Sequence, residues 1–261
     1  MPFNQTINPV LISIGLIEIR FYGIVYILGL LGLLWWLEKN KKELGIDPAE
    51  ATLYLFIGMI IGARLGHCFI YNASFYISNP LQILAIWNGG MRFFGGLIGA
   101  FIAGYLYARK KNIDPWILAD RIVVIVPFFL FLGRIANFLN SELYGKITSV
   151  SWCVYFPGVY GCRHPVQIYE ALKNLLIFII LVSLRNKSWF KNHKASLFSL
   201  FLILYGSLRF IFSFLRDEPI ILLGLTLNHY LSLSLLLVGI ALLIWSGMNG
   251  DIRKTRKRSK R

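Results

Sequence analysis

Long apolar stretches, separated by short polar segments, alternate along most of the chain. A helix that crosses a bilayer needs about 20 mostly apolar residues, and most of these stretches approach that length. They predict an all-α integral membrane protein with seven transmembrane helices, at residues 20–37, 51–72, 93–108, 115–133, 166–184, 195–215 and 223–247. The apolar segment 9–19 is too short to cross, so we expect it to lie along the outer membrane interface.

Composition supports a membrane protein. Hydrophobic residues make up 57% of the 261 residues and charged residues only 15%, whereas soluble domains carry about 25% charged residues. An ordinary soluble enzyme and a disordered chain are therefore excluded. We expect one polytopic membrane domain over residues 1–250, with a structured outer loop at 141–165, and a basic tail at 251–261.

The basic residues predict how the helices are oriented. The chain has 27 Lys and Arg against 12 Asp and Glu, a formal net charge of +15. Basic clusters follow alternate predicted helices, at 39–42, 109–111, 185–194 and 253–261, and such clusters mark the cytoplasmic side. The N-terminus is therefore expected outside and the C-terminus inside, in the cytoplasmic (inner) membrane. We interpret the tail as a topology anchor that attracts anionic lipid, not as a nucleic-acid-binding segment.

The remaining ten cations, eight of them arginine, fall within predicted helices or at their outer ends. An arginine at membrane depth costs at least a few kcal/mol unless it is paired or hydrated. A group of such arginines therefore indicates an anionic partner at the outer side of the membrane.

Two cysteines, Cys153 and Cys162, share the long outer loop. An oxidising compartment would allow them to form a disulfide, and the sequence leaves this pairing open. No spaced set of His, Cys and Glu residues has the pattern of a zinc site, so no metal is expected.

Two polar segments are unusual for membrane helices. In the first, Arg134 and Asn137 are three residues apart, which places them on one helical face, and a guanidinium there can clamp a phosphate through two hydrogen bonds. The alternative is an interfacial arginine paired with Glu142. In the second, Tyr205, Arg209 and Ser213 form a polar stripe on an apolar helix. The alternative there is an inter-helix ion pair of Arg209, for which Glu170 is a candidate.

A third polar segment, residues 163–170, opens the fifth predicted helix. Pro165 fits a helix start. We interpret Gln167 and Glu170 as supporting residues, which cap the helix or pair with an arginine. Glycines at every fourth position in 58–66 and at 95–104 are interpreted mainly as helix-packing positions.

These features together predict an outward-facing membrane cavity that holds a phosphate head group between arginines while acyl chains stay in lipid. Three functional classes fit this chemistry: a lipid-modifying transferase, a phospholipid flippase and an anion transporter. The transporter is the weakest of them, because the sequence shows no internal repeat of the transporter type.

Several motifs make the chain resemble the prolipoprotein diacylglyceryl transferase family. The most specific is GRIANFLNSELYG at 133–145. The others are RFYG around Tyr22, GARLGHCFIYN (62–72), WNGGMRFFGGLIG (87–99), RHPVQIYE (163–170) and LYGSLRF (204–210). The resemblance extends over nearly the whole chain, and the seven-helix topology with an outer N-terminus agrees with it.

The resemblance implies a reaction and its partners. Family members transfer a diacylglyceryl group from phosphatidylglycerol to the lipobox cysteine thiol in the signal-peptide region of a prolipoprotein, forming a thioether and releasing glycerol 1-phosphate. No cofactor or metal is implied. The implied catalytic residues are Arg134, Arg209, Asn137 and Glu142, and the implied substrate-binding residues are Tyr22, Arg64, Gly95, Gly96, Gly145, Tyr205 and His164.

Three positions depart from the family pattern. Phe94 replaces a histidine that has been proposed as the base for the thiol, and Asn88 and Ser213 replace acidic residues. The losses make the cavity more positive, and nearby cations favour ionisation of a cysteine, so the thiol can ionise without a dedicated base. His67 and His164 are alternative bases. A catalytically altered or inactive phospholipid-binding relative is the alternative function.

Overall fold

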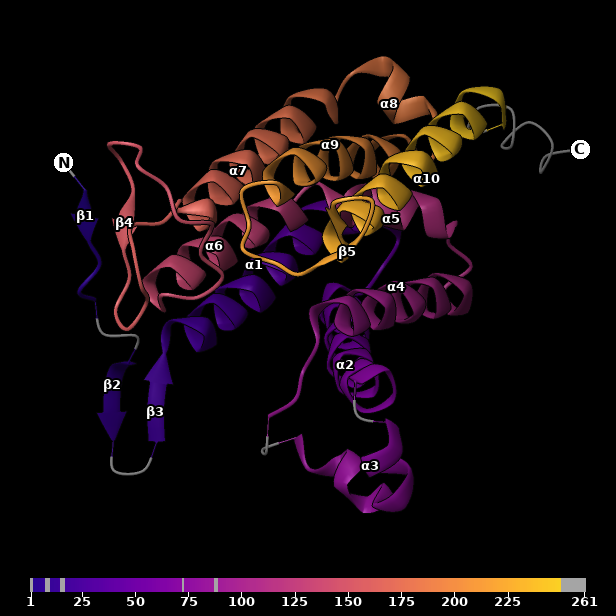
Figure 1. The fold of residues 1–261 in the computed structure, drawn as a ribbon. Helices are drawn as coiled ribbons and strands as arrows, with labels where there is room; N and C mark the ends of the chain where they lie inside the picture. Colours follow the sequence, from indigo (N-terminus) through magenta and orange to yellow (C-terminus); the bar gives the residue numbers. More distant parts are fainter. Residues whose placement is uncertain (1, 8–9, 15–16, 72, 87–88, 250–261) are drawn as a thin grey trace, which may run out of the picture. The chain divides into compact units, whose positions relative to one another are not determined.

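The computed structural model describes residues 2–7, 10–14, 17–71, 73–86 and 89–249 (Figure 1). The described chain is mostly helical and contains three small two-stranded sheets. It divides into two compact units, one formed by residues 1–29 and 120–261 and the other by residues 30–119. Helix α1 (Phe21–Leu44) begins in the first unit and continues into the second.

A row of packed helices forms the centre of the first unit. In this row α6 packs against α7, α7 against α9, and α9 against α10 (Figure 1). Helix α5 leads into α6, and the short α8 connects α7 to α9. Their bounds are α5 Pro115–Val123, α6 Val126–Leu139, α7 Val166–Leu184, α8 Ser188–Asn192, α9 Ser196–Ser213 and α10 Leu227–Asn249.

The packing of this row depends on close approach and on one buried cap. Gly206 of α9 lies so close to α10 that a Cβ atom would be 2.7 Å from the Ser232 carbonyl oxygen. At the start of α9, the buried Asp120 carboxylate accepts a hydrogen bond of 2.8 Å from the Phe198 backbone N–H. This bond satisfies one of the free N–H groups that begin every helix.

The three sheets lie in the segments outside the long helices. Strand β1 (Phe3–Asn4) pairs in parallel with β4 (Val154–Tyr155), so the N-terminal segment adds to the loop between α6 and α7. The Cys153–Cys162 disulfide, which the sequence left open, closes this loop beside β4. The other pairs are antiparallel: β2 (Val10–Ile14) with β3 (Ile17–Arg20), and β5 (Ile220–Leu222) with β6 (Leu225–Thr226).

The number of helices able to cross a membrane is five or six in the described chain. Five qualify by length and apolar composition: Phe21–Leu44, Pro48–Phe69, Val166–Leu184, Ser196–Ser213 and Leu227–Asn249. A sixth is added if α5 and α6, which meet at a bend of 44°, form one span. Every apolar run predicted from the sequence contains a helix, so the protein is a mostly helical, multi-pass membrane protein.

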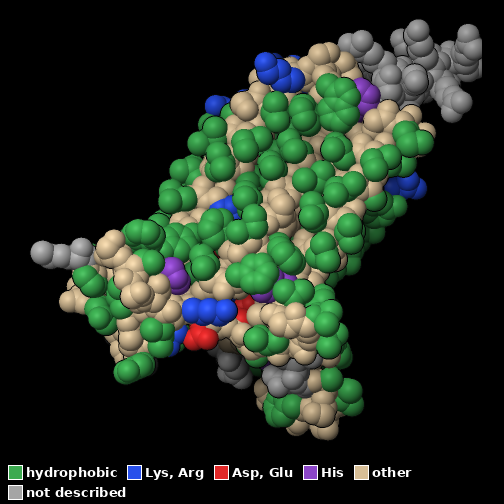
Figure 2. All heavy atoms as spheres, turned by 45° about the horizontal axis from the view of Figure 1, so that its top comes forward, with side chains coloured by type: hydrophobic (Ala, Val, Ile, Leu, Met, Phe, Trp, Pro, Cys, Tyr) green, Lys and Arg blue, Asp and Glu red, His purple; other side chains and the backbone are tan. Residues whose placement is uncertain are grey.

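The break between α5 and α6 has a local cause. Pro127 lies in the first turn of α6, where its missing N–H is tolerated, whereas inside a continuous helix it would remove a hydrogen bond and clash with the preceding turn. Hydrophobic side chains cover most of the visible face of α7, α9 and α10 (Figure 2). In these helices Leu172, Ile179 and Ile244 are exposed. Such a surface suits contact with lipid.

The second unit is organised around two helices rich in glycine. In it α2 (Pro48–Gly66) packs against α4 (Phe93–Lys110). A Cβ atom at Gly62 would lie 2.7 Å from Gly99 Cα, and one at Gly66 would lie 2.9 Å from Gly95 Cα. The predicted packing role of these glycines is confirmed. The chain between the two helices forms a π-helix η1 (His67–Tyr71), α3 (Ala73–Ser78) and a 3₁₀-helix η2 (Pro80–Leu84).

Candidate active site: a buried arginine network

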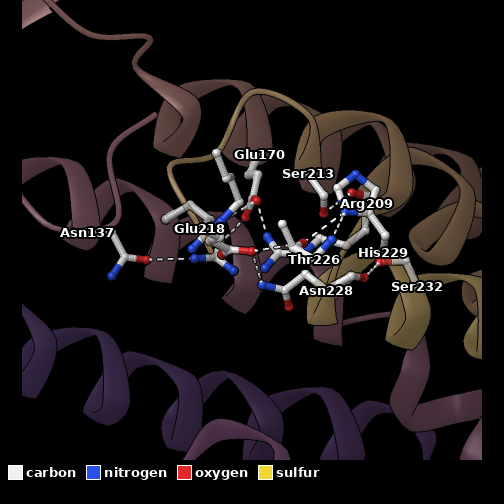
Figure 3. Close-up of polar contacts among 11 residues, drawn as sticks. Asn137, Glu170, Arg209, Ser213, Glu218, Thr226, Asn228, His229 and Ser232 are labelled. Carbon is white, nitrogen blue, oxygen red and sulfur yellow. Dashed lines mark hydrogen bonds and ion pairs between the residues drawn. The ribbon is translucent and has the colours of Figure 1, made fainter. Parts of the chain in front are cut away.

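The Glu170 carboxylate is the centre of the buried polar residues in the first unit. It lies in the second turn of α7 and is fully buried. The guanidinium of Arg134 lies 2.6 Å from one carboxylate oxygen, and that of Arg216 lies 3.3 Å from the other. Arg209 forms an ion pair with the same oxygen as Arg216 (Figure 3). A buried ion without such partners would carry a desolvation penalty of several kcal/mol.

Helix packing brings these charges together. Arg134 comes from the end of α6 and Arg209 from the last turns of α9, and α7, which carries Glu170, packs against both helices. Arg216 lies just beyond α9. Its backbone forms an isolated bridge with Gly145, and the neighbouring Lys146 N–H donates to the Leu215 carbonyl at 2.9 Å. The loop after α6 therefore fixes the position of the third arginine.

A second branch of the network connects Arg134 to α1. The Arg134 guanidinium donates to the Asn137 side-chain oxygen at 3.1 Å (Figure 3). The Asn137 amide donates in turn to the Tyr22 hydroxyl, and this hydroxyl donates to the Glu142 carboxylate at 2.8 Å. Four residues predicted from the sequence thus form one continuous chain of hydrogen bonds.

On its other side the network reaches the segment that joins α9 to α10. Arg216 Nε lies 2.5 Å from the Glu218 carboxylate, and the Asn228 amide donates to the same carboxylate at 2.6 Å (Figure 3). Burial pushes the pKa of Glu218 upward, but the Asn228 hydrogen bond and the Arg216 charge outweigh it and hold the pKa below its usual range. Glu218 is therefore ionised at neutral pH.

The part of the network around Glu170 and Glu218 has more positive than negative charge. Three guanidinium groups face the carboxylates of Glu170 and Glu218. Each guanidinium has five N–H donors in a planar fork, and Glu170 occupies only some of them. The site is therefore suited to bind a further anion with oxygen acceptors, of which a phosphate is the best geometric match.

Gly145 and His164 lie beside the network, in the loop segments that pack against it. A Cβ atom at Gly145 would lie 2.5 Å from Val166 Cγ2 and 2.7 Å from the Leu215 carbonyl oxygen, so only glycine fits there. The Gly145 N–H donates to the His164 carbonyl at 3.0 Å, and the His164 ring lies 3.3 Å from the Tyr169 hydroxyl. Partial burial lowers the pKa of His164 below its ordinary value.

Three predicted substrate-binding residues belong to the second unit. The buried Arg64 side chain donates to four backbone carbonyls, those of Gln82, Ile83, Gly89 and Gly90, and thereby holds the loop before α4. Gly95 and Gly96 are buried at the start of α4, against α2. Phe94 lies in the first turn of α4, and Asn88 lies outside the described residues.

A family model described as prolipoprotein diacylglyceryl transferase matches residues 9–245. The chain belongs to this family. It is 37% identical over 260 residues to the phosphatidylglycerol–prolipoprotein diacylglyceryl transferase of Ehrlichia ruminantium (strain Welgevonden), covering 95% of this chain and the full length of the relative. The proteins of the same name from Geobacter sulfurreducens and Vibrio cholerae are each 38% identical, covering 91% and 94% of this chain and 95% and 93% of those relatives. The resemblance carried by the sequence motifs is thus confirmed.

Of the two ion pairs that the sequence offered as alternatives to phosphate binding, this prolipoprotein diacylglyceryl transferase forms one. Arg209 does pair with Glu170, and Glu170 does support arginines, but Arg134 pairs with Glu170 and not with Glu142. Ser213, which the resemblance to the family places at a usually acidic position, donates its hydroxyl to the Arg209 carbonyl at 2.8 Å (Figure 3). It therefore supplies no charge to the network.

Sequence reasoning missed two charged members of the network, Arg216 and Glu218, and undervalued Glu170. One signal was available for Glu170, because it is the only acidic residue in the apolar run 166–184, and an isolated acid in a membrane helix needs a cationic partner.

Among the described residues, no group of three or more His, Cys, Asp or Glu side chains is arranged to hold a metal ion.

Proposed function

We propose that the arginine network binds the phosphate of phosphatidylglycerol while the diacylglyceryl group is transferred. The reaction itself follows from the family and from full-length relatives: the protein is a phosphatidylglycerol–prolipoprotein diacylglyceryl transferase. The acceptor is the cysteine thiol of a prolipoprotein. The observation that carries the proposal is the meeting of Arg134 and Arg209, from two helices, on the single buried carboxylate of Glu170.

The chemistry of the transfer explains why cations are needed. The sulfur forms a bond to the glycerol carbon attached to the phosphate oxygen, and the bond between that carbon and that oxygen breaks. The departing glycerol 1-phosphate takes the electron pair, so negative charge builds on its oxygens. Preorganised donors beside such a charge are commonly the largest catalytic contribution, and removing one costs about 10²- to 10³-fold in rate.

We assign the roles as follows. Arg134 and Arg209 bind the phosphate and stabilise the leaving group, and Glu170 orients both guanidinium groups before substrate arrives. Asn137, Tyr22 and Glu142 orient Arg134 through their chain of hydrogen bonds. Tyr205, four residues before Arg209, and the loop residues Gly145 and His164 shape the surrounding pocket.

Activation of the thiol is assigned to the same positive charge. Phe94 stands where the family's histidine is usual, and three arginines surround the site. Cations beside a thiol favour its thiolate form, so the acceptor cysteine ionises near the network and its proton passes to water, without a dedicated base.

The proposal includes a membrane orientation. The basic clusters of the sequence favour seven crossings with the N-terminus outside, and therefore an active site that faces the outer leaflet of the cytoplasmic membrane. The disulfide in the loop after α6 supports this orientation, because disulfides form in oxidising compartments.

The function is tested with the purified protein in detergent, phosphatidylglycerol and a lipobox peptide, by measuring the mass gain of a thioether-linked diacylglyceryl group. We expect turnover by the wild type and loss of at least about 10²-fold in Arg134→Ala and Arg209→Ala. Arg109→Ala, an exposed arginine of the inner basic cluster, is the control and should keep wild-type turnover.

Two outcomes would contradict the proposal. Wild-type protein that retains bound phosphatidylglycerol but forms no thioether would be a phospholipid-binding relative without catalysis. Full activity in either Arg134→Ala or Arg209→Ala would remove that arginine from the phosphate site.

A further inference from the structure

Lys173 is a buried lysine that the roles assigned above do not use. It lies one turn after Glu170 on α7, and only 4% of the residue is exposed. Among the described residues, its ammonium has no hydrogen-bond acceptor. It lies instead over the aromatic ring of Tyr205, 4.2 Å from the ring centre.

An ammonium buried in this way indicates an anionic partner that binds there. Each of its three N–H groups is a donor, and a buried charge without hydrogen bonds is costly. The cation–π contact with Tyr205 fixes the direction of the side chain but accepts none of these hydrogen bonds. The side chain is therefore held in place with its donors available.

The charges around Lys173 define what that partner is. Lys173 interacts electrostatically with Glu170, Arg209, Arg134 and Arg216. Four cations then belong to a network with three carboxylates, those of Glu170, Glu218 and Glu142, which leaves one positive charge in excess. A phosphate monoester carries about −1.5 to −2 charges at pH 7, whereas the donor lipid carries one, so the Lys173 ammonium attracts the phosphate that the transfer releases more strongly than it attracts the donor lipid.

Lys173 also has a route to lipid. Together with Tyr169, Leu172, Leu176, Leu208 and Phe212 it lines a hollow of about 300 Å³ between α7 and α9. Most of these side chains are apolar and suit an acyl chain. Lys173 is the one charged residue of the hollow's described lining, so a lipid lying in it would present its head group to the ammonium.

We propose that Lys173 is an additional phosphate-binding residue of this transferase, which holds the phosphate from the α7 side. Its attraction grows as the leaving group gains its second charge, so it stabilises the transition state more than bound substrate. This inference rests on the proposed function of the arginine network.

The test compares Lys173→Met, which keeps an apolar stem but removes the charge, with Lys173→Arg, which keeps the charge. For Lys173→Met we expect kcat to fall about 10²-fold, with a smaller change in KM for phosphatidylglycerol. The inhibition constant of added glycerol 1-phosphate should rise about tenfold. Lys173→Arg should recover most of both losses. Lys187→Met, which removes an exposed lysine of the first unit, should match the wild type.

A second measurement does not depend on turnover. Glycerol 1-phosphate should raise the thermal unfolding temperature of the wild type, because a ligand that binds only the folded state stabilises it. This protection should be largely lost in Lys173→Met and retained in Lys173→Arg. If Lys173→Met does not fold, Lys173→Gln takes its place with the same expected results.

Three results would overturn the inference. The first is unchanged product inhibition and unchanged thermal protection in a folded Lys173→Met protein. The second is a rate loss that disappears at high pH, which would make Lys173 the acceptor of the thiol proton instead. The third is an Arg variant as impaired as the Met variant. In each case an active wild type leaves the proposed function standing, whereas a wild type that forms no thioether contradicts the proposed function itself.

Discussion

At Glu170, one carboxylate offsets three guanidinium groups that would otherwise repel each other inside the protein. Removing one partner of a buried ion pair is more costly than replacing the whole pair, because the remaining charges are left desolvated and unpaired. Glu170 therefore has a structural role in addition to the orienting role proposed for it in catalysis.

We predict that Glu170→Gln destabilises the protein by between about 3 and 5 kcal/mol. The amide keeps the shape of the side chain but removes its charge, so three arginines lose their common counterion. Thermal unfolding in detergent measures the loss. Glu142→Gln is the control, because Glu142 is exposed and its carboxylate accepts a hydrogen bond from the neutral Tyr22 hydroxyl. Equal unfolding temperatures for the two variants would contradict the central position of Glu170.

A second prediction at the residue scale concerns Gly145. Gly145→Ala would place a methyl group within 2.5 to 2.8 Å of Val166, Leu215 and His164, so the loop must move away from α7. Overpacking of this kind costs about 1–3 kcal/mol, and it displaces Arg216 through the backbone bridge. We expect lower stability and lower turnover in the transfer assay.

Gly133→Ala is the matched control for Gly145→Ala. Gly133 lies in α6, and no atom lies within 4 Å of the position that its Cβ would take. Because alanine favours a helix over glycine by about 1 kcal/mol, this variant should be at least as stable as the wild type. Two variants of equal stability would show that the packing around Gly145 is looser than the structure has it.

The sequence was informative about Arg134 and Arg209 for a specific reason. Arg134 directly follows the apolar run 115–133 and Arg209 lies in the run 195–215. Both runs end on the same predicted side of the membrane, so the topology alone places the two arginines near one another in depth. Arg216 was less predictable, because it lies beyond the end of α9, where helical periodicity no longer places a side chain. Its position depends on a backbone bridge to Gly145, more than 70 residues earlier in the chain.

At the scale of the elements, long helices followed from their apolar runs, whereas the short strands did not. Strand β1 has two residues, Phe3 and Asn4, and pairs with Val154 and Tyr155. Two residues show no alternation of apolar and polar positions, so nothing in the pattern marks a strand. The break within 115–139 had a visible signal in Pro127, but a proline in a membrane helix is often tolerated without ending it.

The contact between α2 and α4 gives a prediction at this scale. Gly62→Ala would place a methyl group against the backbone of Gly95 and 2.7 Å from Gly99 Cα, and backbone cannot rotate away as a side chain can. We expect the helices to separate and the unfolding temperature to fall, by a cost of about 1–3 kcal/mol.

Gly104→Ala in α4 is the comparison for Gly62→Ala. The nearest atom to its added methyl group would be the end of the flexible Leu55 side chain, at 3.1 Å, so a small rotation makes room. Its unfolding temperature should stay close to that of the wild type. A similar fall in the unfolding temperature of both variants would indicate that added volume destabilises the whole contact between α2 and α4. The close approach of Gly62 to the α4 backbone would then have no separate effect.

At the scale of the whole molecule, the site and the disulfide lie at corresponding ends of the helices in the first unit. Arg134 is near the end of α6, Glu170 near the start of α7 and Arg209 near the end of α9. The loop with Cys153 and Cys162 joins α6 to α7 at this same end. Whichever side of the membrane holds the disulfide therefore also holds the arginine network, which makes thiol chemistry a direct test of orientation.

We predict that this end faces outside. Among the described residues Cys68 is the one free cysteine, so mass analysis of alkylated, unfolded protein should count one thiol before reduction and three after it. In spheroplasts treated with a membrane-impermeant reductant, an impermeant maleimide should then label the loop cysteines without permeabilisation. A cysteine placed in the basic tail, Ser259→Cys, should react only after the membrane is opened. The reverse order of labelling would place the arginine network on the cytoplasmic side. That orientation would put the basic clusters outside, against the positive-inside rule, and the disulfide in a reducing compartment.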